Sequence, residues 1–171
     1  MFEKFGEFDS YEELNRAAEA QRAEGDLEAL KAIAKENGID TEDAEDYLEG
    51  CVETFTTPLI AAAGKLKVEA GELELGGILL DWSDQIVAAC AKNRNLQIAV
   101  RRKEKSLAAC LASLIRFAFE HKVLVSDKIV KITTVNHNGK EESMRSPLYL
   151  GIPNRAEADE LIIKYYLEGR T

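Results

Sequence analysis

The sequence contains no apolar run of the roughly 18 residues that a membrane-spanning helix needs. Its N-terminus is acidic and lacks the basic, then apolar, pattern of a secretory signal peptide. Cysteines are few and odd in number, and Cys51, Cys90 and Cys110 each lie within an apolar helical pattern. They indicate buried thiols rather than a disulfide framework, which fits a reducing compartment. We therefore expect a cytoplasmic protein.

Residue types that carry catalysis or hold cofactors are also scarce. The two histidines, His121 and His137, lie outside any recognisable motif, and the simplest interpretation is a last-turn helix residue and a turn residue. The cysteines are too far apart in sequence for a zinc site. The glycine patterns of phosphate-binding and dinucleotide-binding loops are absent. We expect neither an enzyme nor a protein with a metal or a cofactor.

Charge is present in quantity but is unevenly placed. Of the 171 residues 46% are hydrophobic and 31% charged, which is typical of a soluble globular protein. Residues 1–53 carry 17 acidic and 5 basic side chains, a net charge of −12, whereas residues 54–171 carry 14 acidic and 17 basic side chains, a net charge of +3. An acidic end of this kind repels nucleic acid and attracts basic protein surfaces.

The densest group of carboxylates falls in the third predicted helix, which begins at Asp40 or Thr41. Its members lack the glycine and the alternating ligand spacing of a calcium-binding loop, which favours a solvated helix face over a cation site. A partner protein with a positively charged surface could bind this face. The acidic candidate residues are Glu42, Asp43, Glu45, Asp46 and Glu49.

The most apolar segment is 106–122, where apolar residues recur at helical spacing on nearly every side. Ser106 is a natural N-cap, and Phe117 and Phe119 extend the apolar surface beyond the main face. A helix that is apolar all round is normally buried on several sides. We therefore predict a mostly α protein: a helical bundle around a central buried helix at 106–122, with a small N-terminal helical unit.

The segments around this helix predict three parts. Residues 1–53 form an acidic three-helix unit with short turns, and residues 54–77 form a connecting segment, because glycines interrupt its pattern after a short helix. Residues 78–171 form a helical domain. Within it, Ser126-Asp127 begins a short helix that buries Ile129 and Val130, and β-branched residues around Asn138-Gly139 predict a β-hairpin or a loop near 132–150.

A basic cluster lies just before the predicted central helix. It could neutralise phosphates of a nucleic acid, or it could be only the exposed side of a short helix at 93–103. Aromatic residues for base stacking are missing beside it, and the following helices have the outline of a helix-turn-helix with only Lys128 and Lys131 to face DNA. The candidate nucleic-acid contacts are Lys92, Arg94, Arg101, Arg102, Lys103 and Lys105.

The C-terminal part resembles the PcfK-like family of small proteins, which are encoded on conjugative elements and phages. The resemblance rests on KSLAAC at 105–110, on DKIV at 127–130, and on Leu114, Ile115, Ala118, Tyr165 and Tyr166. Members of that family include type II-A anti-CRISPR proteins that inhibit Cas9, and the resemblance supplies no catalytic residues. It implies an inhibitor that acts by stoichiometric binding in the cytoplasm of a bacterial host. Its partner would be a Cas9-type nuclease, alone or with its guide RNA or target DNA.

Two other functions remain open from the sequence. The basic cluster suggests an accessory DNA-binding protein of a conjugative element or phage. A structural partner of another mobile-element protein is the third alternative. A membrane or a small-molecule substrate is not indicated.

Overall fold

The computed structural model describes residues 5–168, and within them helices predominate, which confirms the predicted mostly α fold. The helices are α1 (Tyr11–Glu24), α2 (Leu27–Glu36), α3 (Thr41–Glu49), α4 (Pro58–Glu72), α5 (Ile78–Cys90), α6 (Arg94–Arg101), α7 (Leu107–Glu120), α8 (Asp127–Val130) and α9 (Arg155–Leu167). The strands are β1 (Val123–Leu124), β2 (Thr134–His137), β3 (Lys140–Ser143) and β4 (Tyr149–Leu150). Strand β1 pairs with β4, and β2 pairs with β3, both antiparallel.

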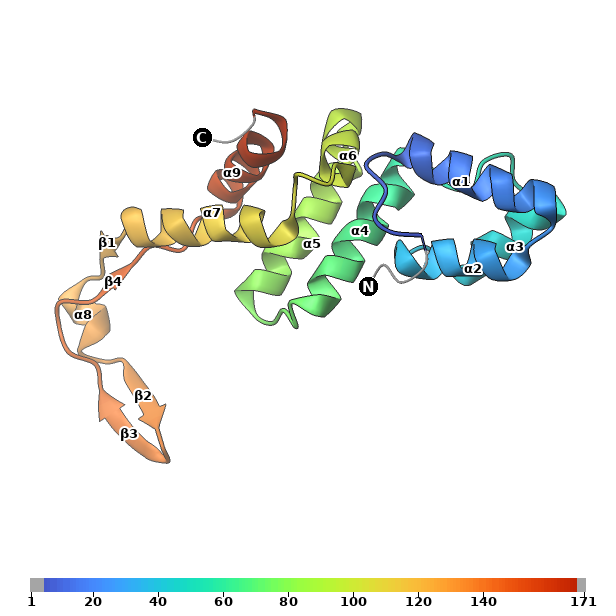
Figure 1. The fold of residues 1–171 in the computed structure, drawn as a ribbon. Coiled ribbons are helices and arrows are strands. Elements are labelled where there is room, and N and C mark those ends of the chain that lie inside the picture. Colours follow the sequence, from blue (N-terminus) through green and yellow to red (C-terminus); the bar gives the residue numbers. More distant parts are fainter. Residues whose placement is uncertain (1–4, 169–171) are drawn as a thin grey trace.

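Helices α1, α2 and α3 form the predicted acidic unit, with a hydrophobic core of its own (Figure 1). Each helix begins at a side-chain cap, because Ser10, Asp26 and Asp40 accept hydrogen bonds from first-turn amides. The core includes Leu14, Leu30, Ile33, Ala44 and Tyr47, all of which are buried. Since the apolar residues point inward, the carboxylates of these helices are left on the outside.

Residues 54–77 are not the connecting segment that we predicted. Thr57 caps a continuous 15-residue helix, α4, with Pro58 in its first turn, and the helix runs through Gly64 and Gly71. Gly64 lies against the backbone of Asn37 and Gly38 at the end of α2. A glycine that looks like an interruption in the sequence is therefore the point where α4 meets the acidic unit.

The second hydrophobic core belongs to α4, α5, α6, α7 and α9, so this domain begins near residue 58 rather than 78. Helix α4 supplies Ala62 and Leu66, and α9 supplies Ala158, Ile162 and Tyr166. Asn154 and Glu157 form a capping box that fixes the start of α9. The domain thus packs around α4 and α6 as much as around α7.

The prediction of a central buried helix at 106–122 is confirmed for the N-terminal half of α7 and wrong for its C-terminal half. Leu107, Cys110, Leu111 and Leu114 are buried, as expected. Phe119, in contrast, is 69% exposed. Only the N-terminal half of α7 packs in the core, because its C-terminal half extends away from the domain (Figure 1).

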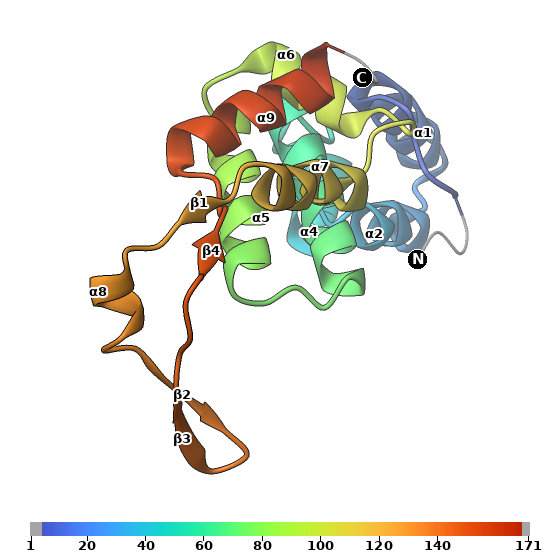
Figure 2. The same cartoon turned by 90° about the vertical axis from the view of Figure 1, so that its left-hand side faces the viewer.

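Residues 115–152, here called the arm, project from the rest of the molecule in both views (Figures 1 and 2). Within the arm, the β1–β4 pair, here called the neck, lies nearest the domain, and α8 and the β2–β3 hairpin lie beyond it. The hairpin confirms the β alternative, with Asn138 and Gly139 at positive φ in its turn. In α8 Val130 is buried, but Ile129 is exposed, contrary to prediction.

Candidate partner-binding surfaces and the buried charge network

Helix α3 presents its carboxylates to solvent. Ala44 and Tyr47 hold the helix against the core of the acidic unit. Glu42, Asp46 and Glu49 are exposed and follow one another at i, i+4 and i+7, so they form a single stripe along the helix. Like charges at this spacing repel one another and weaken a helix slightly. The helix dipole favours Glu42, which lies in the first turn, but not Asp46 and Glu49, so the stability of α3 does not explain the whole stripe.

The other two acidic candidates differ from this stripe. Glu45 is exposed but forms an ion pair with Lys31 of α2, with 2.6 Å between Nζ and Oε1. This carboxylate raises the pKa of Lys31. Asp43 is only half-buried and lies in the first turn, where the helix dipole favours a negative charge. All five predicted residues thus lie on α3, and the freely presented charge is that of Glu42, Asp46 and Glu49.

The structure divides the predicted basic cluster. Lys92, Arg94, Arg102 and Lys103 are exposed, and Arg102 lies 3.8 Å from Glu104. Arg101, which we placed on the outside, is 1% exposed, and Lys105 is 7% exposed. The Lys105 ammonium donates to the backbone oxygen of Tyr165 at 2.6 Å. Arg101 and Lys105 are structural residues that cannot contact phosphates, so four of the six predicted cations remain on the surface.

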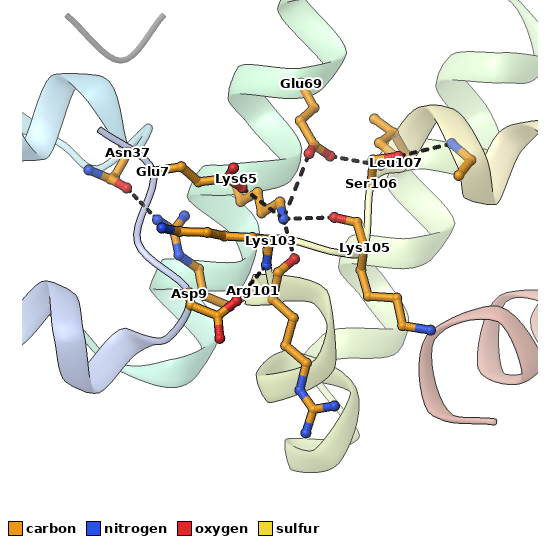
Figure 3. Close-up of polar contacts among 12 residues, drawn as sticks. Glu7, Asp9, Asn37, Lys65, Glu69, Arg101, Lys103, Lys105, Ser106 and Leu107 are labelled. Carbon is orange, nitrogen blue, oxygen red and sulfur yellow. Dashed lines mark hydrogen bonds and ion pairs between the residues drawn. The ribbon is translucent and has the colours of Figure 1, made fainter. Parts of the chain in front are cut away.

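Lys65 is the centre of a buried charge network between the acidic unit and the helical domain (Figure 3). Its ammonium lies 3.1 Å from a carboxylate oxygen of Glu7 and donates to the backbone oxygens of Arg102 and Lys105 at 2.6 and 2.7 Å. Glu69, one turn further along α4, accepts a hydrogen bond from the backbone amide of Leu107 at 2.8 Å. One lysine thus connects the N-terminal segment with the loop that precedes α7.

Arg101 completes the network from α6. Its Nη2 donates to the side-chain oxygen of Asn37, at the end of α2, whereas its Nε and Nη1 have no hydrogen-bond partner among the described residues. Burial lowers the pKa of Arg101, and the charges of Glu7 and Glu69 partly oppose this effect. Burial also raises the pKa of Glu69, although the Leu107 amide and Lys65 lower it. Arg101 lines a cavity of about 60 Å³, which has room for a few water molecules.

These contacts fix how the acidic unit sits on the helical domain. The Oδ1 of Asp9 accepts a further hydrogen bond from the amide of Lys103 at 2.8 Å (Figure 3). Charges buried in this way are retained only when paired, so the network orients the two units rather than offering reactive groups. The acidic stripe of α3 is consequently held in a defined direction relative to the helical domain.

The remaining candidates for chemistry are unreactive or exposed singly. Burial raises the pKa of the Cys90 and Cys110 thiols to about 12, so both are protonated at neutral pH. Cys51 is exposed, contrary to prediction, because α3 ends at Glu49 and the chain turns at Gly50. His121 stacks on Phe117, 4.0 Å between ring centroids, and His137 lies on the hairpin. Residues 5–168 contain no cluster of side chains suited to a metal ion.

The exposed apolar surface of the arm is a candidate binding surface that the sequence did not predict. Val123, Leu124, Tyr149 and Leu150 form the neck and are 50–67% exposed. Their β-branched and aromatic character was a signal for strands, but the distance of 24 residues between β1 and β4 concealed their pairing. Exposure could not be predicted, because apolar residues normally indicate a core.

Comparisons with protein-family models, curated proteins and solved structures find no match to this chain. Within the described part of the chain, no helix has both the length and the apolar character needed to cross a membrane. The surfaces themselves must therefore carry the functional argument.

Proposed function

We propose that this protein acts by binding, as a stoichiometric inhibitor of a type II RNA-guided nuclease, with its acidic unit as the contact surface. The observation that carries the proposal is the exposed stripe of Glu42, Asp46 and Glu49 on a unit whose sequence has a net charge of −12. A nuclease of this type holds its nucleic acids in positively charged channels. A rigid polyanion can occupy such a channel in place of a phosphate backbone.

Two further features support this proposal. Two of the segments that carry the resemblance to PcfK-like proteins lie together, whereas the third, at 127–130, is α8 on the arm. The Tyr165 hydroxyl accepts a hydrogen bond from the amide of Ser106 at 3.0 Å, and its ring lies under the Lys105 ammonium. The buried network around Lys65 also holds the acidic unit firmly, so little ordering is needed on binding. The alternative function, binding of DNA through the basic cluster, is less well supported than it was by the sequence. Arg101 and Lys105 are buried, so only four of the six predicted cations could contact phosphates.

The test is cleavage of a target DNA in vitro by purified Cas9 and guide RNA. The protein is titrated before or after guide loading, and before or after target binding. We expect inhibition to be complete near equimolar amounts and to weaken as salt is added, because the contact is between charged surfaces. Full cleavage at a large molar excess, with several type II-A nucleases, would refute the proposal.

A further inference from the structure

The arm exposes more apolar surface than a monomer normally tolerates. Ten large apolar side chains of this segment are 40–82% exposed: Ile115, Phe119, Val123, Leu124, Ile129, Ile132, Val135, Tyr149, Leu150 and Ile152. Summed along the arm and over both of its faces, they expose on the order of 1,000 Å²; a single contiguous apolar patch of about 300–600 Å² is already the largest on a typical monomer. A standard interface buries about 800 Å² on each partner. The arm alone therefore offers enough surface for a stable complex.

The neck needs cover on both sides. Val123 lies opposite Leu150, and Leu124 lies opposite Tyr149, in antiparallel register. Because side chains alternate between the two faces of a strand, each pair occupies a different face of the ribbon. Both pairs are at least half exposed. A ribbon that is apolar on both faces fits between two surfaces rather than on a single flat one.

The outgoing and returning chains of the arm are tied to each other. An added Cβ at Gly151 would overlap the carbonyl oxygen of Ala118, so the returning chain lies directly against α7. The amide of Val125 donates to the oxygen of Leu148 at 2.8 Å, and Ser146 donates to Asp127 at 2.6 Å. The hydrogen bonds connect the outgoing and returning chains along the arm. Its apolar surface is thus presented in a fixed shape.

A complementary surface lies where the arm rejoins the domain. A groove on α5, next to Pro153, is lined by apolar side chains that include Ile78 and Ala88. It also carries the exposed charges of Asp81, Asp84 and Arg155, a net charge of −1. Pro153, which lines this groove, directly follows the last residue of the arm in the chain, so the groove lies beside the base of the arm.

The charge of the arm is opposite to that of this groove. The arm has 6 basic and 4 acidic side chains, a net charge of +2, and Lys122, Lys128 and Lys131 are exposed on it. An apolar, basic arm therefore matches an apolar, acidic groove.

We infer that the arm docks on a second copy of this chain, with the neck of each copy seated between the arm and the α5 groove of the other. Each copy has one arm and one groove, so a two-fold arrangement fills both grooves and covers both arms. The neck is covered on both faces, as its pattern of side chains requires. This dimer goes beyond the proposed function, and neither depends on the other.

The test is the mass of the full-length protein in solution, measured by light scattering and sedimentation between about 1 and 100 μM, because interfaces of this size have dissociation constants of about micromolar or below. We expect twice the mass of one chain. Leu124→Glu and Tyr149→Glu should each raise the dissociation constant at least about tenfold, because each places a charge in the apolar contact. Leu73→Glu, at a site 42% exposed at the end of α4, is the control and should leave the dimer intact. Circular dichroism checks that each variant keeps its helices.

A charge exchange tests the groove. Chains with Asp81→Lys and Asp84→Lys, and chains with Lys128→Glu and Lys131→Glu, should each be monomeric alone, because arm and groove then carry like charges. Mixed together they should form a heterodimer, in which both contacts are again between opposite charges. A wild-type mass of one chain at every concentration would overturn the inference. A dimer that Leu124→Glu leaves unchanged, or a mixture that stays monomeric, would overturn it as well.

Discussion

Gly64 and Gly71 lie seven residues apart in α4, yet alanine should have opposite effects at the two positions. A Cβ added to Gly64 would overlap the carbonyl oxygen of Asn37 and would lie 3.3 Å from the carbonyl carbons of Asn37 and Gly38. These are backbone atoms, which cannot turn aside as a flexible side chain can. A Cβ added to Gly71 has no atom within 4 Å. The two sites therefore separate packing from helix propensity within one helix.

The expected magnitudes follow from these surroundings. An extra methyl group in a packed site costs about 1–3 kcal/mol, and the rigid backbone opposite Gly64 places it near the upper value. Replacing glycine by alanine inside a helix returns about 1 kcal/mol. Gly64→Ala should thus lower the free energy of unfolding by about 2 kcal/mol, and Gly71→Ala should raise it by up to about 1 kcal/mol. For a chain of this size, 1 kcal/mol corresponds to about 2–4 °C in Tm.

Urea denaturation and thermal melting, followed by circular dichroism, measure both changes. We expect the Tm of Gly64→Ala to fall by about 4–8 °C and that of Gly71→Ala to rise by about 2–4 °C. A Gly64→Ala variant as stable as the wild type would refute the close contact between α4 and the end of α2. The placement of the acidic unit on the helical domain would then also be wrong.

Three further predictions concern buried and exposed polar groups. In the native protein a thiol reagent should modify Cys51 rapidly, and Cys90 and Cys110 only after unfolding. Burial and a raised pKa leave no accessible thiolate at Cys90 and Cys110. Equally fast modification of all three thiols would show that Cys90 and Cys110 are not in the core. Arg101→Met should lower the free energy of unfolding by about 3 kcal/mol, as Glu7 and Glu69 lose a buried counter-charge, whereas Arg102→Met should change it by less than about 0.5 kcal/mol. Burial raises the pKa of Glu69 in the folded state above its ordinary 4.5, so the folded state binds the proton more tightly than the unfolded state does. The Glu69 carboxyl therefore lowers the free energy of unfolding as the pH rises from 4.5 through the raised pKa. The stability of Glu69→Gln relative to the wild type should accordingly increase over that pH range, and a constant or decreasing difference would show that desolvation of Glu69 does not dominate.

The local structure was largely predictable from the sequence. Ser106 caps α7 as expected, because capping depends on residues only a few positions apart. Ser10, Asp26 and Asn154 cap their helices in the same local way. The Asn138-Gly139 turn was predictable for the same reason, since both residues favour positive φ.

Features that depend on distant parts of the chain were not predictable. Arg101 has the sequence surroundings of an exposed cation, but it is buried at the end of α6 and donates to Asn37, 64 residues earlier in the chain. The exposure of Phe119 also depends on distant residues. Helical periodicity predicts that α7 has an apolar face, but it does not show whether other parts of the chain pack against that face. The acidic residues of α3 were found because a solvated charged face needs no distant partner.

The comparison that tests the proposed function most directly is target cleavage with charge variants of the two surfaces. One variant carries Glu42→Lys, Asp46→Lys and Glu49→Lys, and leaves the Lys31–Glu45 ion pair in place. The matched variant neutralises the exposed cations Lys92, Arg94, Arg102 and Lys103 with glutamine. We expect the acidic-stripe variant to lose inhibition of the nuclease and the matched variant to retain it. Inhibition that survives reversal of the stripe and disappears with the four cations would contradict the account and assign the contact to nucleic acid.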